Sequence, residues 1–209
     1  MAPFKIWLVA AWHFVRSAPL TYLWLTVLLI TTVIQNIAGR RLHTLLVDQS
    51  TNLHHLATEP LEVLFASLLW IDGNYWTPYL VLFTLFLAPA ERWLGHLRWL
   101  AIGLTAHVGA TYLSEGALYL LINLQSEPER LVYARDIGVS YFLVGVMAVL
   151  TYHIHSPWRW VYLPLLVVIV TFPVVIRADF TAIGHVAAML IGLACYPLTR
   201  WHPLAHEQQ

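Results

Sequence analysis

Two side chains in this sequence could form a nucleophilic pair: Ser140 in the stretch DIGVSYF and His185 in the stretch GHVAAMLIG. A serine hydroxyl becomes a nucleophile when an imidazole within hydrogen-bond reach accepts its proton. Ser140 lies four positions after Asp136, and His185 six positions after Asp179, each within an otherwise apolar run. If the aspartates mark a membrane surface, helical rise places the two side chains roughly 6 and 9 Å below it. This matched depth predicts acyl-transfer chemistry near one face of a membrane.

Small residues around His185 indicate how the two segments could meet. Gly184, Ala188 and Gly192 recur at every fourth position, which is the spacing through which membrane helices approach one another closely. His185, Ala188 and Gly192 also share one helical face, so the imidazole is expected to point along this packing seam. Gly138, at the start of the serine segment, permits an equally close approach from the other side.

The composition identifies the elements that must hold this pair. Of the 209 residues, 59% are apolar and 11% are charged, and the mean hydropathy is +0.68, which predicts an integral membrane protein. The expected fold is all-α, a polytopic bundle of six transmembrane helices. Apolar runs long enough, or nearly long enough, to span a bilayer lie at residues 20–35, 75–90, 99–121, 137–152, 160–176 and 180–198.

The chain is expected to be a single membrane domain over residues 1–209. Residues 1–16 place their charged side chains on one helical face and predict a helix lying on the membrane surface. The longest stretch between spans, residues 36–74, contains the apolar segment PLEVLFASLLWIDG and is expected to be a loop of short helices embedded in the outer leaflet.

Charge gives the expected orientation. With the N-terminus inside, six of the 11 Lys and Arg residues lie on the cytoplasmic side and five outside, which is a weak bias. We expect a multi-pass protein of the cell membrane with both termini cytoplasmic. Its expected partners are membrane lipid and a transmembrane protein, as substrate or client, and we expect no nucleic acid and no cofactor.

Three motifs resemble those of the rhomboid family of intramembrane serine proteases. GVSY at residues 138–141 is similar to the nucleophile motif G-x-S-G, and GHVAAMLIG is similar to the sixth-helix motif of a histidine followed by small residues. ERWLG at residues 91–95 resembles the E-x-x-x-G motif between the second and third spans. The likeness covers nearly the whole chain and suits a divergent branch of the kind found in actinobacteria. It implies that Ser140 is the nucleophile, His185 is the general base, and the substrate is a transmembrane segment.

The chain also departs from the rhomboid pattern. Tyr141 follows the expected nucleophile where the family has glycine, and Tyr75 and Tyr79 stand where the second span of rhomboid proteases carries a histidine and an asparagine. Loss of one oxyanion donor typically costs about 10²–10³ in rate. Gly138, Tyr141 and Asn74 could line the site or replace the missing donors.

Two other functions therefore stay open besides an intramembrane serine endopeptidase. A rhomboid-fold protein without catalysis could bind transmembrane partners through the same lateral opening. A small transporter or proton relay could use His107, Glu115 and His185, but it predicts polar residues at every depth of the membrane, whereas these gather in the outer half.

The remaining polar residues in apolar runs have structural interpretations. His107 is expected to hydrogen-bond a neighbouring helix, and Glu115 to face water or cap a polar cluster. The histidine pairs at residues 54–55 and 153–155 lack carboxylates or cysteines at ligand spacing, so no metal site is expected.

Overall fold

The fold is helical throughout the part of the chain that can be described. The computed structural model describes residues 11–38, 51–71, 73, 75–124, 128, 138–176 and 179–200, and no strand occurs among them. Residues 11–16 form a helical turn that precedes the first long helix. The elements are α2 (Pro19–Ala38), α4 (Leu53–Thr58), α5 (Pro60–Ala66), η1 (Ser67–Leu69), α6 (Thr77–Leu82), η2 (Phe83–Leu87), α7 (Ala88–Leu94), α8 (His96–Asn123), α9 (Val139–Leu150), α10 (Arg159–Ile176), α11 (Phe180–Ala194) and α12 (Tyr196–Thr199).

These helices confirm the expected all-α class but not the expected number of spans. By length and composition, two of the described helices could cross a membrane, at Pro19–Ile37 and Arg159–Ile176. α9 and α11 are apolar but shorter, with 12 and 15 residues. The first ten residues of the expected surface helix, and residues 39–50 of the expected first loop, lie outside the described part.

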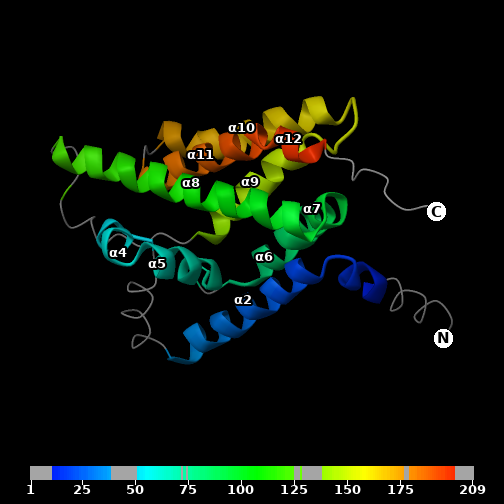
Figure 1. Ribbon diagram of the computed structural model, residues 1–209, viewed down its shortest axis with the longest axis horizontal. Coiled ribbons are helices and arrows are strands. Elements are labelled where there is room, and N and C mark those ends of the chain that lie inside the picture. Colours follow the sequence, from blue (N-terminus) through cyan, green and yellow to red (C-terminus); the bar gives the residue numbers. More distant parts are fainter. Residues whose placement is uncertain are drawn as a thin grey trace, which may run out of the picture.

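Three helices form the centre of the molecule. α8, α9 and α11 pack against one another more extensively than any other elements described, and α10 packs on the outer side of α11 (Figure 1). The backbones of α9 and α11 touch, because a Cβ atom added to Gly192 would overlap the backbone of Gly145. Only glycine at this crossing lets the two helices lie this close.

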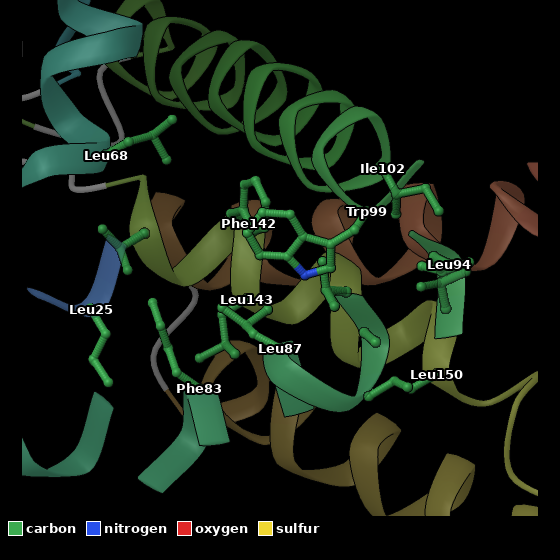
Figure 2. Close-up of a cluster of buried hydrophobic side chains, with 14 of the residues drawn as sticks. Leu25, Leu68, Phe83, Leu87, Leu94, Trp99, Ile102, Phe142, Leu143 and Leu150 are labelled. Atoms are coloured by element: carbon green, nitrogen blue, oxygen red, sulfur yellow. The ribbon is translucent and has the colours of Figure 1, made fainter. Parts of the chain in front are cut away.

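A second layer packs on the other side of α8. Phe142 of α9 lies over Gly103 of α8, where a side chain would overlap its ring. Its ring centroid is 4.7 Å from that of Trp24 and 5.0 Å from that of Trp99, and both contacts are edge-on. Figure 2 shows Phe142 and Trp99 within a buried cluster that also includes Phe83. This cluster joins α2, η1, η2 and α7 to the central helices.

The long expected loop contains the short helices α4, α5 and η1, which lie along α8 (Figure 1). Asn52 caps α4 through a hydrogen bond of 3.0 Å from the N–H of His55 to its side-chain oxygen. Leu56, Val63 and Leu64 form a small buried cluster against Val108 of α8. Trp24 of α2 donates its indole N–H to the carbonyl of Leu68 at 2.7 Å.

A buried carboxylate fixes the start of α2. Glu91 of α7 is 1% exposed and accepts backbone N–H groups from Leu20 at 3.0 Å and from Thr21 at 2.8 Å. These donors belong to the first turn of α2, where N–H groups have no partner within the helix and the helix dipole is positive. Nδ1 of His96 lies 2.7 Å from the same carboxylate. Gly95, between them, has φ of 78°, which turns the chain from α7 into α8.

The close contact between Gly192 and Gly145 predicts that alanine is tolerated differently at two glycines. Gly192→Ala should lower the free energy of unfolding by about 1–3 kcal/mol, because its methyl group must push α9 and α11 apart. Gly116→Ala should change it by less or raise it by up to about 1 kcal/mol, since no atom lies within 4 Å of the added carbon. Thermal unfolding of both variants in detergent measures the difference. Equal effects would contradict the close backbone contact.

The capping carboxylate gives a second prediction. Glu91→Ala should destabilise the protein by about 3 kcal/mol, because it leaves buried N–H groups of α2 without an acceptor. The exposed Glu62→Ala, on α5, is the control and should change the free energy of unfolding by no more than about 0.5 kcal/mol. A midpoint of thermal unfolding that is the same for both variants would show that Glu91 does not support α2.

Candidate active site

At the N-terminal ends of α9 and α11, the side chain of Tyr141 contacts that of His185. The two ring centroids are 5.1 Å apart and the rings are inclined at 70°, an edge-to-face contact. Tyr141 is 0% exposed, and its ring lies so close to Gly184 that a Cβ atom there would overlap it. The phenol therefore fills the space between α9 and the start of α11.

The small residues of the expected seam lie along this same interface. Gly184 faces Tyr141, and Gly192 faces the backbone of Gly145. Between them, Ala188 is 0% exposed and belongs to a buried cluster with Tyr141 and with Ala106 of α8. All three small residues are thus buried between α11 and its neighbours.

Ser140 is half-buried and is the second residue of α9. Successive residues of a helix point about 100° apart, so Ser140 and Tyr141 lie on adjacent faces of α9. One turn further along, Val144 contacts the cluster around Tyr141 and also the cluster that joins α10 to α11. Ser140 thus lies beside the residue that contacts His185, at the same end of the two helices.

Gly138 is the N-cap residue of α9 and lies against α8. A Cβ atom at Gly138 would overlap the imidazole of His107. Nε2 of His107 is 3.0 Å from the carbonyl oxygen of Leu64 in α5. Because that oxygen can only accept, Nε2 carries the proton, and Nδ1 of the neutral ring is an acceptor. His107 thus connects α8, the first loop and the start of α9. Its hydrogen bond to α5 agrees with the expected bond to a neighbouring helix.

A line of buried polar side chains continues along α8 from His107. Thr111 and Ser114 are 0% exposed and Glu115 is 1% exposed. Of the two alternatives expected for Glu115, exposure to water is wrong, because this side chain lies on the buried face of α8. A place in a polar cluster stays a prediction. Nδ1 of His107 and Oγ1 of Thr111 find no hydrogen-bond partner among the described residues. The spacing of His107, Thr111 and Glu115, four residues apart in an apolar run, was a signal in the sequence that these side chains share one face.

Asn74 is expected as a possible replacement for the missing oxyanion donors, and Tyr75 and Tyr79 stand at the positions where those donors are missing. Asn74 lies outside the described residues. Tyr75 is 78% exposed, whereas Tyr79 packs against the main core with its ring 6.2 Å from that of Phe83.

Asp179 caps α11 by accepting the N–H of Ala182 at 2.7 Å. Among the described residues, no group of three or more His, Cys, Asp and Glu side chains could hold a metal ion.

An apolar cavity of about 380 Å³ lies on the other side of Phe142. Its walls come from α2, from α5 and η1 of the first loop, and from α8 and α9. The residues that line it are Leu20, Leu23, Trp24, Val27, Phe65, Leu68, Leu69, Trp99, Leu100, Leu104 and Phe142. A cavity with these walls can accept hydrocarbon but offers no polar group to orient a reacting bond.

Comparison with known protein families decides the classification. A family model described as rhomboid-like protein matches residues 13–205, nearly the whole chain. The chain belongs to the rhomboid-like family. Rhomboid-like proteins are membrane proteins, and the apolar helices of this chain agree with that. Searches of curated proteins and of solved structures found no match.

The hydrogen bond of His107 predicts how the first loop of this rhomboid-like protein is held. His107→Leu should leave the Leu64 carbonyl without its donor and lower the free energy of unfolding by about 1–3 kcal/mol. Backbone amides of α4 and α5 should exchange with deuterium faster, while those of α11 should keep their rate. The control is His54→Leu, which changes an exposed histidine of α4. Unchanged exchange in α4 and α5 would contradict the role of this bond.

Proposed function

We propose that this rhomboid-like protein is an intramembrane serine endopeptidase that cleaves transmembrane segments, with Ser140 as the nucleophile and His185 as the general base. The contact between Tyr141 and His185 is the observation that carries the proposal. It holds the start of α9 against α11, and Ser140 is the residue directly before Tyr141 in that turn. The family match over residues 13–205 supports a rhomboid fold around this pair.

The proposed reaction uses Ser140 and His185 as a nucleophile and its general base. The imidazole of His185 accepts the Ser140 hydroxyl proton while the oxygen attacks the carbonyl carbon of the scissile bond, and it returns the proton to the leaving amine. Water then hydrolyses the acyl-enzyme. Backbone N–H groups in the first turn of α9 are the proposed oxyanion donors. His107 cannot take that role in its present tautomer, because Nδ1 accepts and Nε2 already donates to Leu64.

The proposal includes the arrangement in the membrane. We place the chain in the cell membrane with six spans and with both termini on the cytoplasmic side, so that Ser140 and His185 lie near the outer face. The long apolar helices α2 and α10 support spanning. α9 and α11 are short but flanked by α8 and α10, so their polar ends can be shielded from lipid by protein.

A second candidate is a rhomboid-fold protein that binds transmembrane partners without cleaving them. The observation that favours it is the complete burial of Tyr141 against Gly184 and His185, since a bulky ring occupies the space beside the imidazole. The described part of the second span also presents no histidine or asparagine, from Tyr75 to Leu87. Binding alone would require only the apolar lateral surface.

A serine-directed fluorophosphonate probe separates the two candidates. Purified wild-type protein should be labelled, and Ser140→Ala and His185→Ala should reduce labelling to background, since loss of either member of such a pair slows catalysis by about 10⁴-fold or more. Ser114→Ala is the matched control, because Ser114 is a buried helical serine whose hydroxyl donates to the carbonyl of Thr111 at 3.0 Å. It should keep wild-type labelling.

Two outcomes would overturn the protease proposal. One is labelling that persists in Ser140→Ala, which would locate the nucleophile elsewhere. The other is absence of labelling in folded wild-type protein, assayed beside an active rhomboid protease as a positive control. That result would leave binding of transmembrane partners as the function to pursue.

A further inference from the structure

A polar cavity of about 450 Å³ lies at the opposite end of α9 from Ser140, and no step of the proposed proteolysis uses it. It forms where α7, the turn after α9, the start of α10 and α12 come together (Figure 1). Six residues line it: Trp93, Tyr152, Arg159, Tyr196, Thr199 and Arg200. Two of these six side chains are positively charged.

Arg159 is fixed in place by the turn that follows α9. Its Nε donates to the carbonyl of Ile154 at 2.9 Å, and its Nη2 donates to the carbonyl of Tyr152 at 3.2 Å. A guanidinium has five N–H donors, so three remain available on the side that these carbonyls leave open. Both acceptors are uncharged, so these two hydrogen bonds hold the charge at the cavity wall without neutralising it.

Arg200 supplies the second charge from the end of α12. Its guanidinium lies over the ring of Tyr196, 5.5 Å from the centroid, which positions it through a cation–π contact. Among the described residues, neither Arg200 nor Arg159 forms an ion pair, and the ion pair described in this region joins His96 to Glu91. Glu91 is already occupied by the first turn of α2.

The other walls of the cavity are largely aromatic, as is common where a protein meets the boundary between lipid hydrocarbon and headgroups. The rings of Tyr152 and Tyr196 are 4.7 Å apart, and the Tyr152 hydroxyl donates to the carbonyl of Leu193 at 2.8 Å. The ring of Trp93 lies against that of His153, with centroids 4.7 Å apart and the rings inclined at 31°. Burial and the neighbouring His155 lower the pKa of His153, so the arginines supply the positive charge at neutral pH. Tyrosine and tryptophan at helix ends are typical of a membrane interface.

We propose that this cavity binds the phosphate of an anionic phospholipid, with Arg159 and Arg200 as its ligands. Guanidinium groups match phosphate oxygens in charge and geometry, and basic pockets between membrane helices are suited to anionic headgroups. The site lies at the ends of α7, α9 and α12, where we expect the surface of the bilayer if these helices span it. This inference is independent of the proposed proteolysis.

Native mass spectrometry of the purified full chain in neutral detergent tests the proposal. Titrated phosphatidylglycerol should bind more tightly than phosphatidylcholine, and Arg200→Gln should weaken phosphatidylglycerol binding by about tenfold or more, as expected for loss of one charge-assisted hydrogen bond. Arg200 is preferred to Arg159 because Arg159 also holds the turn after α9. The control is Arg92→Gln, which removes an exposed arginine that lies 4.4 Å from the centroid of Phe14 and outside the cavity.

Three outcomes of these binding measurements would overturn the proposal. Equal phosphatidylglycerol affinity for wild type and Arg200→Gln, with both shown to be folded by thermal unfolding, would remove the cavity from lipid binding. An equal loss in Arg92→Gln would show that only net charge matters. A parallel titration with inorganic phosphate distinguishes the source of the ligand: if it protects the protein against unfolding as well as phosphatidylglycerol does, soluble phosphate and not lipid is bound.

Discussion

The backbone contact between Gly145 and Gly192 is the constraint on which the rest of the molecule depends. Helices in a membrane gain little from burying apolar side chains against one another, since lipid is equally apolar, so their association relies on close van der Waals packing. Here α9 and α11 approach until any side chain at Gly192 would overlap the facing backbone. The contact sets the rotation of both helices, and that rotation brings Tyr141 onto His185.

α8 completes the arrangement by carrying the polar groups that lipid would not accept. Its line of buried polar residues begins at His107, which reaches the carbonyl of Leu64 in the first loop and lies against Gly138. One imidazole thus joins three segments that are far apart in the sequence. A short loop helix at the edge of a membrane protein must have its polar backbone groups satisfied by protein or water, and His107 provides this for α5.

The two ends of the bundle differ in their electrostatics. Near the start of α2, the buried carboxylate of Glu91 accepts two backbone N–H groups and contacts His96. Its role is therefore to hold α2 in place. Close by, the guanidinium groups of Arg159 and Arg200 line a cavity without an acidic partner among the described residues. At the other end of α9, Tyr141 packs on His185 and Gly184, and the imidazole of His107 lies against Gly138. Proposed chemistry and proposed lipid binding therefore occupy opposite ends of the same helix.

The sequence by itself determined the helical class, the membrane character and the rhomboid-like motifs, because these depend on composition and on spacing along one helix. It also placed Gly184, Ala188 and Gly192 on one face, since helical periodicity is a local property. Only the tertiary structure decided that Tyr141 contacts His185, that Glu115 is buried, and that His107 meets Leu64 and Gly138. These contacts depend on how far each helix is rotated and shifted against its neighbours. Periodicity identifies a face, but the packing of side chains from distant segments decides what that face meets.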